Sequence, residues 1–273
     1  MLHQGFAKRQ VWAVLALIWL MAGAALAQPA KRDLAAVLAA GELRVGVSEY
    51  APWSLHGKGG ELIGAEVDIA RRLAADMGLK AVVSSHDWQD LVPALQRGDI
   101  DVIAAGLTIT PELALEVALT HPYRRSGVGL ATNLQLTESF RSLQELNAPE
   151  VAIAVIADTP SATLARRVFS RAAIKPFKEP REAEKAVLDG LVHAYVRANP
   201  APRYLALKHP RRVDVPLDRP LLEFREALAV RKGDPDFVNF LNAWIVARQD
   251  DAWLRSTDSY WFESLDWQQQ VQP

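Results

Sequence analysis

The stretch KAVVSSHDWQDLVPALQRGDIDVIAAG, residues 80–106, decides the fold class. Its β-rich start predicts a strand at 80–84, and its apolar end predicts a buried strand at 101–105. Between them, a helix capped by Asp87 is expected to end at Gly98. Because a strand, a helix and a strand at this spacing form a crossover unit, we predict an α/β fold with a mostly parallel sheet.

The same alternation extends to both sides of this stretch. Further strands are expected at 43–47, 150–157, 193–198 and 224–234. Helices are expected at 64–78, 160–170, 181–190, 202–209, 235–248 and 250–264. The last helix is rich in aromatic residues, which we expect to pack in a core rather than contact a ligand.

The first 27 residues have the features of a secretory signal peptide. Lys8 and Arg9 precede an apolar run at 11–25, which at about 15 residues is short for a membrane span of about 20. The tripeptide ALA at 25–27 is a small-x-small cleavage signal. We predict cleavage after Ala27 and a soluble mature protein in the periplasm, with an uncleaved membrane anchor as the alternative.

The composition excludes several kinds of site. The chain has no cysteine, so disulfides, thiolate metal sites and a lipid-bearing cysteine are excluded. Without Lys8 and Arg9, 29 of the 31 basic residues remain against 32 acidic ones, and a net charge near −3 argues against nucleic acid as a partner. His86 and His193 have no potential ligands nearby at metal-binding spacing, so we expect no metal. We also expect a monomer without a cofactor.

Candidate ligand contacts cluster where the predicted strands end, which is where ligands bind in such sheets. Tyr50 and Trp53 lie in a polar, glycine-rich loop after the first strand, and Trp88 follows the second. Gly106 and Thr108 follow the third strand. Core packing is an equal alternative for Trp88, and a tight turn with a helix cap is the alternative for the Gly106 corner.

Three segments carry a resemblance to a known family. They are GELRVGVSEYAPWSL at 41–55, GAEVDIARRLAADMGLKAVVSSHDWQDLVPALQRGDIDVIAAGLTITPE at 64–112 and ALAVRKGDPDF at 227–237. Together they resemble the extracellular solute-binding proteins, family 3, of amino-acid ABC transporters. The resemblance implies a two-lobe periplasmic binding protein type II fold, or Venus flytrap, with mostly parallel sheets.

The resemblance also implies that the chain crosses between the lobes twice, near 130–133 and 224–230. Lobe 1 would then comprise 28–131 together with 225–273, and lobe 2 would comprise 132–224. The C-terminal helix would pack on lobe 1. The lobes would close over a ligand by hinge motion.

The family's site residues are only partly matched in this chain. Tyr50 and Trp53 match aromatic residues that stack on the ligand, and Gly106 and Thr108 match groups that hold its carboxylate. Leu113, however, occupies the place of the arginine that would grip that carboxylate with two hydrogen bonds. Similarly, Ala198 occupies the place of the aspartate that binds the ligand ammonium group.

Other candidates are less well matched. Thr159 follows the first strand of lobe 2, where the family offers a hydroxyl, but Asp158 and Pro160 depart from the family pattern. Three arginines could replace the missing cation, although we expect each to be a solvated surface residue: Arg124, Arg125 and Arg197. Arg197 alternates with Ala198 on a strand, so it cannot simply take over the role of the aspartate.

These residues favour a binding protein that captures a small organic ligand for an ABC transporter permease in the inner membrane. The missing charged groups argue against an ordinary α-amino acid as that ligand. One alternative is an accessory protein that binds no small ligand or binds a protein. The other is an enzyme resembling cyclohexadienyl dehydratases, but Ala162 stands where the required acid is expected.

Overall fold

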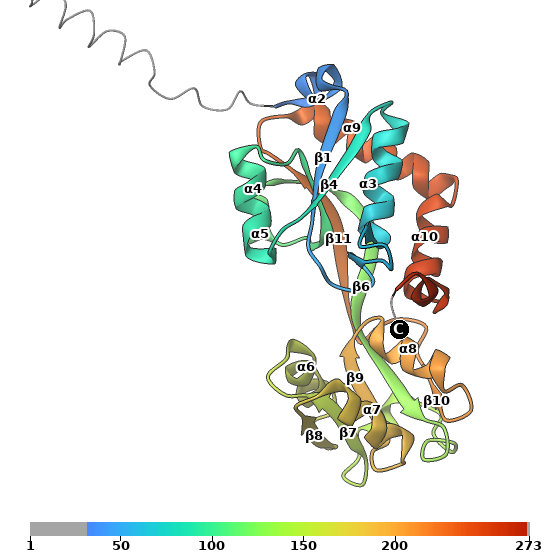
Figure 1. The fold of residues 1–273 in the computed structure, drawn as a ribbon. Helices are drawn as coiled ribbons and strands as arrows, with labels where there is room; N and C mark the ends of the chain where they lie inside the picture. Colours follow the sequence, from blue (N-terminus) through green and yellow to red (C-terminus); the bar gives the residue numbers. More distant parts are fainter. Residues whose placement is uncertain (1–31, 272–273) are drawn as a thin grey trace, which may run out of the picture.

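The computed structural model describes residues 32–271, which form two lobes joined by two long strands, β6 and β11 (Figure 1). The predicted signal peptide and its cleavage site lie outside these residues. No helix within 32–271 is long and apolar enough to cross a membrane.

The predicted alternation of strands and helices is confirmed. The strands are β1 (Glu42–Val47), β2 (Leu55–His56), β3 (Leu62–Ile63), β4 (Lys80–Ser85), β5 (Val102–Thr108), β6 (Ala118–Asn133), β7 (Ala152–Ile156), β8 (Ala173–Phe177), β9 (Ala194–Ala198), β10 (Val213–Asp214) and β11 (Leu222–Val230). The α-helices are α2 (Leu34–Ala40), α3 (Ala65–Asp76), α4 (Leu91–Arg97), α5 (Pro111–Glu116), α6 (Pro160–Val168), α7 (Pro180–Leu188), α8 (Ala201–Lys208), α9 (Pro235–Asp250) and α10 (Trp253–Phe262). Short 3-10 helices are η1 (Trp88–Asp90), η2 (Leu143–Leu146) and η3 (Asp266–Gln270).

One sheet runs through both lobes in the order β4-β1-β5-β11-β6-β9-β7-β8, with β10 beside β6. In lobe 1, β1 is parallel to β4 and β5, and in lobe 2, β7 is parallel to β8 and β9. At the junction, β6 pairs antiparallel with β11 as far as Val128, and with β9 from Val128 to Thr132. The predicted parallel units are therefore confirmed, and two antiparallel strands connect them.

Two local predictions differ from the structure, and two strands were missed. The strand expected at 101–105 continues through Gly106 to Thr108, because its last residues pair with β11. The Asp87 side chain makes no capping hydrogen bond, since the segment after it begins as the 3-10 helix η1. The strand β8 and the 16-residue strand β6 were not predicted.

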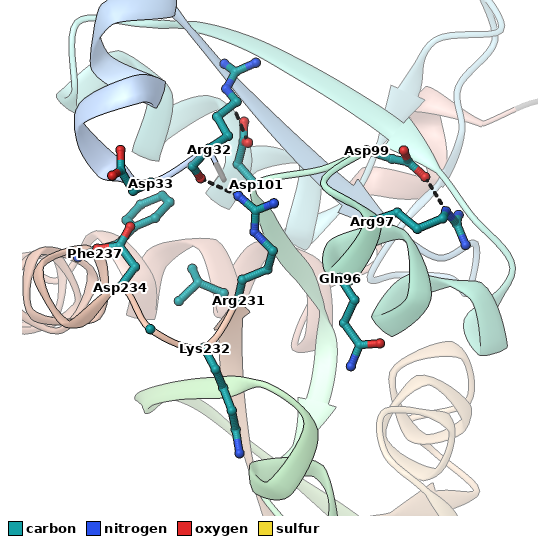
Figure 2. Close-up of a pocket in the computed structure, with 12 residues that line it drawn as sticks. Arg32, Asp33, Gln96, Arg97, Asp99, Asp101, Arg231, Lys232, Asp234 and Phe237 are labelled. Atoms are coloured by element: carbon teal, nitrogen blue, oxygen red, sulfur yellow. Dashed lines mark hydrogen bonds and ion pairs between the residues drawn. The ribbon is translucent and has the colours of Figure 1, made fainter. Parts of the chain in front are cut away.

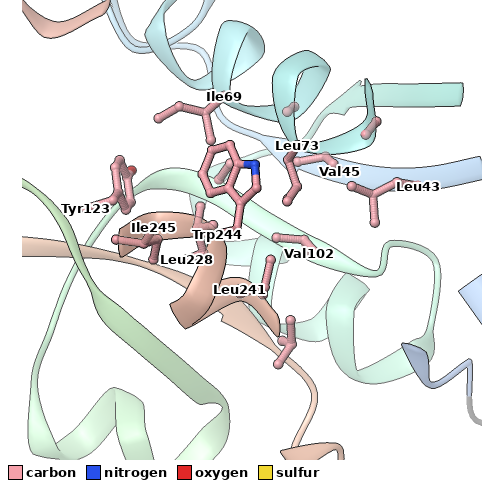
Figure 3. Close-up of a cluster of buried hydrophobic side chains, with 14 of the residues drawn as sticks. Leu43, Val45, Ile69, Leu73, Val102, Tyr123, Leu228, Leu241, Trp244 and Ile245 are labelled. Carbon is pink, nitrogen blue, oxygen red and sulfur yellow. The ribbon is translucent and has the colours of Figure 1, made fainter. Parts of the chain in front are cut away.

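Each lobe has its own hydrophobic core. In lobe 1, α3 and α9 cover one face of the sheet, and Trp244 of α9 packs near Ile69 and Leu73 of α3 (Figure 3). The Trp244 indole donates a 2.8 Å hydrogen bond to Asp76 at the end of α3. In lobe 2, α6 packs against one face of the sheet, and α7 and α8 pack against the other.

The aromatic C-terminal segment packs on lobe 1, as predicted. Trp261 of α10 is buried, and its indole donates a 2.7 Å hydrogen bond to Asp68 of α3. The same segment also reaches lobe 2, because the Tyr204 hydroxyl of α8 donates a hydrogen bond to the Trp261 carbonyl. The C-terminal segment therefore contacts both lobes.

The prediction that Arg124 is a solvated surface residue is wrong. Its side chain is 3% exposed and lies at the lobe junction on β6. The guanidinium pairs with Glu66 of α3, with Glu226 of β11 at 3.2 Å and with Asp258 of α10 at 2.7 Å. It also lies over the Phe262 ring, 4.5 Å from the ring centre. One cation thus joins three separate segments of the chain.

The burial of Arg124 has a local cause. The pairing of β6 with β11 shifts between Arg124 and Pro122, as in a β-bulge, and this interrupts the alternation of inward and outward side chains. Tyr123 and Arg124 are consequently both buried, although they are neighbours on one strand. Arg125 behaves as predicted: it is 66% exposed and pairs with Glu223 at 2.9 Å.

Glu66 is the most perturbed carboxyl group of this cluster. Burial raises the pKa of Glu66 to about 7, the Arg124 guanidinium opposes this shift, and the Glu226 carboxylate adds to it. Tyr123 donates a 2.8 Å hydrogen bond to the same carboxyl group. Since one guanidinium faces three carboxyl groups, retention of a proton on Glu66 near neutral pH relieves the excess of negative charge.

Arg124 and Arg125 provide a matched test of this cluster. We expect Arg124→Gln to lower the free energy of unfolding by about 3–5 kcal/mol, because it leaves three buried or partly buried carboxyl groups without their cation. Arg125→Gln should change it by less than about 0.5 kcal/mol. Urea unfolding of both variants measures the difference, and equal effects would contradict the assigned roles.

The raised pKa of Glu66 predicts a pH dependence of stability. Its stabilising contribution is fully present below the ordinary pKa of 4.5 and is lost as the pH rises through about 7. Between pH 5 and pH 8, the wild type should therefore lose about 1–3 kcal/mol of unfolding free energy relative to Glu66→Gln. Glu116→Gln on the exposed face of α5 is the control. Parallel pH profiles for wild type and Glu66→Gln would show that Glu66 does not titrate in this range.

Candidate functional site

The predicted site residues lie on the edges of the two lobes that face each other. Thr108 at the carboxyl end of β5 pairs with Glu226 of β11, close to the junction. Ala198 at the carboxyl end of β9 pairs with Val128 of β6, also at the junction. Because β1 is parallel to β5 and β7 is parallel to β9, the loops after all four strands lie on these edges. We call them the interlobe edges.

One well-defined cavity lies elsewhere. It measures about 660 Å³ and lies at the opposite end of lobe 1, where β5 begins and β11 ends (Figure 2). Its charged groups already have partners: Arg97 pairs with Asp99 at 2.8 Å, and Arg231 donates to the Arg32 carbonyl at 2.6 Å. None of the predicted site residues lines this cavity, so we do not assign it as the binding site.

Tyr50 and Trp53 have different environments, although both were predicted as ligand contacts. Tyr50 is 61% exposed, whereas Trp53 is only 8% exposed. The Trp53 indole donates a 3.2 Å hydrogen bond to Glu226, and its ring meets the edge of Phe262 at 4.8 Å. The Tyr50 ring lies 5.4 Å from the Trp53 ring. The buried Trp53 ring therefore anchors the loop to the protein interior, whereas Tyr50 presents an exposed aromatic ring.

The Gly106 corner has a structural explanation. Gly106 has a φ of +65°, and a Cβ atom there would lie 2.5 Å from the Trp53 indole nitrogen. Only glycine fits a positive φ with so close a contact. The helix after the corner is capped by Thr110, whose hydroxyl accepts a 3.2 Å hydrogen bond from the Leu113 amide. The hydroxyl of Thr108 makes no hydrogen bond to another residue of 32–271, so it is available to a ligand.

Leu113, which takes the place of the expected arginine, belongs to the apolar interior. Its half-buried side chain packs against a cluster formed by α4, β5 and the start of β6. Trp88, by contrast, is 56% exposed at the start of η1, which rules out core packing for this ring. On the interlobe edge, lobe 1 thus offers exposed aromatic rings and a free hydroxyl, and no arginine at the expected place.

Thr159 caps a helix. Its hydroxyl donates a 2.8 Å hydrogen bond to the Ile156 carbonyl and accepts one from the Ala162 amide at 3.2 Å. Asp158, just before it, is exposed and has a φ of +57°, a conformation that glycine adopts more easily. The predicted contact between Thr159 and a ligand stays a prediction, because its hydroxyl is already used within the fold.

Arg197 and Tyr195 form a pair that the sequence pattern indicated only in part. Residues two apart on a strand share a face, and Arg197 donates a 3.2 Å hydrogen bond to the Tyr195 hydroxyl. Burial raises the pKa of Tyr195 to about 12, and the Arg197 charge opposes this shift. Because Tyr195 packs with α7 and α8, Arg197 lies on the same face of β9 as these helices.

Known proteins resemble this chain over most of its length. The cyclohexadienyl dehydratase of Pseudomonas aeruginosa is 25% identical over 256 residues, which cover 93% of this chain and 95% of the relative. The octopine-binding periplasmic protein of Rhizobium meliloti is 25% identical over 68% of this chain and 71% of the relative. A solved structure, an ancestral cationic amino acid solute-binding protein, superposes with a TM-score of 0.70 at 31% identity, covering 83% of this chain and 97% of the other.

A family match over residues 43–264 identifies the family. This range includes all the strands of both lobes except the first residue of β1. This range also contains every candidate contact described above. The chain belongs to the bacterial extracellular solute-binding proteins, family 3.

Proposed function

We propose that this protein captures a small organic solute in the periplasm and delivers it to an ABC transporter permease in the inner membrane. We further propose that the solute is not an ordinary α-amino acid. The observation that carries this second part is the pair of uncharged residues Leu113 and Ala198 at the two places where the family resemblance implies charged contacts to an amino acid. The exposed rings of Tyr50 and Trp88 favour an apolar or aromatic ligand body instead.

The energetic cost supports this proposal. An α-amino acid carries a carboxylate and an ammonium group, and both lose water when two lobes close around them. Removing one partner of a desolvated charge pair costs about 2–5 kcal/mol. At about 1.4 kcal/mol per tenfold change in affinity, two such losses turn a micromolar binder into one too weak to matter.

The proposed mechanism is hinge closure at β6 and β11. The lobes would comprise 28–131 with 225–273, and 132–224. The mature protein would begin at Gln28 after cleavage of the signal peptide, and it would act as a monomer. Support for the hinge comes from the change of pairing partner at Val128 of β6, where the strand passes from lobe 1 to lobe 2.

A dehydratase is the second candidate, because a relative of that name matches 93% of this chain. Against it, the position near the start of α6 where an acid is expected is Ala162, which is 1% exposed. A neutral methyl group there cannot protonate a leaving hydroxyl. Turnover of a cyclohexadienyl acid such as prephenate by the purified protein would favour the enzyme over the binding protein.

A screen of the twenty amino acids tests the proposed specificity. We expect no thermal stabilisation that corresponds to a sub-micromolar dissociation constant for any of them, because Leu113 and Ala198 offer no charge. Calorimetry on every compound that shifts the melting temperature provides the measurement. Sub-micromolar binding of any of the twenty would sink the proposal.

The reverse experiment restores both charges. Leu113→Arg combined with Ala198→Asp should create measurable affinity for some amino acid, because the backbone groups of the Gly106 corner and the Thr108 hydroxyl are retained. Each single variant is the matched control and should gain much less. A double variant that folds and binds no amino acid would show that the cleft has lost more than these two side chains.

Because Tyr50 is exposed and Trp53 is buried, we expect their substitutions to have different effects on solute binding and on protein stability. Tyr50→Ala should change the free energy of unfolding by less than about 1 kcal/mol and weaken the binding of any solute found by screening. Trp53→Ala should cost about 3–5 kcal/mol of stability, because it removes a buried ring and a hydrogen bond to Glu226. Thermal unfolding and calorimetry on both variants distinguish the two roles, and a reversed order would refute the assignment.

A further inference from the structure

We propose that the C-terminal segment 253–271, which comprises α10 and η3, couples the position of lobe 2 to the loop 50–63 of lobe 1. Tyr204 of α8 is the residue that attaches lobe 2 to this segment. The loop carries Tyr50 and Trp53, so the position of lobe 2 would influence where these rings lie. The inference goes beyond the proposed function, because it concerns how the lobes are held when no solute is present.

Tyr204 contacts the C-terminal segment through a hydrogen bond and through its ring. The half-buried side chain donates a hydrogen bond from its hydroxyl to the Trp261 carbonyl, and its ring centre lies 5.9 Å from that of Trp267. Both tryptophans belong to a hydrophobic cluster of lobe 1 that includes Ile63. Among the hydrogen bonds of the described chain, the Tyr204 bond is the one that joins α8 to this segment. A residue of lobe 2 therefore packs against a core cluster of lobe 1.

The same segment contacts the loop on its other side. The Lys58 amide donates a 2.9 Å hydrogen bond to the Gln270 carbonyl at the end of η3. Phe262 meets the edge of the Trp53 ring at 4.8 Å. The strand β3, which ends the loop, contributes Ile63 to the cluster that also contains the tryptophans of the segment. A displacement of the segment would therefore change contacts at the start, the middle and the end of the loop.

The attachment is a local contact beside an open space. Figure 1 shows α8 next to the C-terminal end of the chain. A cavity of about 230 Å³ lies between them and is lined by Arg203 of α8 and by Asp258 and Glu263 of the C-terminal segment. Arg203 forms no ion pair with either acid. Because the charged groups at this cavity do not join the two elements, α8 can move relative to α10 once the contact of Tyr204 is lost.

The position of η3 depends on ring packing. The Trp267 indole nitrogen is buried and has no hydrogen-bond partner within the described chain. An unsatisfied buried donor is unfavourable, so no polar contact of this ring holds it in place. The ring instead packs near Trp261, at 5.8 Å between ring centres, and near Tyr204. Removal of the Tyr204 ring should therefore loosen η3 together with its contact to the loop.

Electron spin resonance measures the link to lobe 2. Because the chain has no cysteine, Glu116→Cys on α5 and Arg167→Cys on α6 place one spin label at an exposed position of each lobe. Without solute, Tyr204→Ala should change the ratio of the wild-type interlobe distance to other distances about fivefold, as expected for the loss of about one net hydrogen bond. Leu207→Ala, which truncates an exposed side chain of the same helix, is the matched control and should leave the distances unchanged.

Hydrogen exchange measures the link to the loop. Tyr204→Ala should raise the amide exchange rates of 50–63 and 264–271 by about threefold or more, although the substitution lies in the other lobe. Peptides from β7 and β9 in lobe 2 are the internal reference and should exchange as in the wild type. Tyr204→Phe, which removes only the hydroxyl, should give a smaller change in the same direction in both measurements. This variant carries the test if Tyr204→Ala does not fold.

The two measurements together decide the inference. Interlobe distances that stay unchanged in both Tyr204 variants overturn it, and so does a changed distance with unchanged exchange in the loop. An equal effect of Leu207→Ala, or a uniform rise of exchange that includes β7 and β9, would show that the substitutions only destabilise the fold, and this also overturns the inference. Since no solute is added, none of these outcomes depends on the proposed ligand class.

Discussion

The Arg124 guanidinium is the interaction on which the arrangement at the lobe junction depends. It joins the start of α3, the strand β11 and the helix α10, which are far apart in the sequence. A buried cation with three acidic partners has few alternative positions, because any displacement leaves a carboxyl group without compensation in a poorly solvated place. The two long strands therefore enter lobe 1 along a fixed path, and the proposed hinge motion is expected to bend them beyond Arg124.

The same interaction extends to the interlobe edge of lobe 1. Glu226 accepts hydrogen bonds from Arg124 and from the Trp53 indole, and Trp53 in turn lies against Tyr50. The exposed Tyr50 ring is therefore connected to the buried ion cluster of Arg124 through Trp53 and Glu226. The hydrogen bond from the Tyr204 hydroxyl to the Trp261 carbonyl links α8 of lobe 2 to the C-terminal segment. In the proposed hinge closure, α8 and the C-terminal segment must move together for this hydrogen bond to persist.

The sequence predicted the repeating units well because each is encoded locally. Apolar runs and glycine stops, such as Gly98, mark the strands and helices of both lobes. The position of Arg124 could not be predicted in this way, because a bulge in β6 and partners at Glu66, Glu226 and Asp258 decide it. The burial of Trp53 also depends on distant residues, above all Phe262. In the candidate site, the exposed ring of Tyr50 agreed with its loop position, whereas the contact between Arg197 and Tyr195 required the register of β9.

Retention of a family motif does not by itself report the ligand. Gly106 is required by its positive φ and by the nearness of Trp53, and Thr110 is required as a helix cap. Both residues would be needed whether or not a carboxylate is bound at this corner. The informative positions are those at which the resemblance implies a charged group that this chain lacks: Leu113, which packs against an apolar cluster of lobe 1, and Ala198. Neither side chain can pair with an ionised group of a ligand, so the cost of desolvating a carboxylate or an ammonium group there would not be offset, and this is why an ordinary α-amino acid is not the proposed ligand.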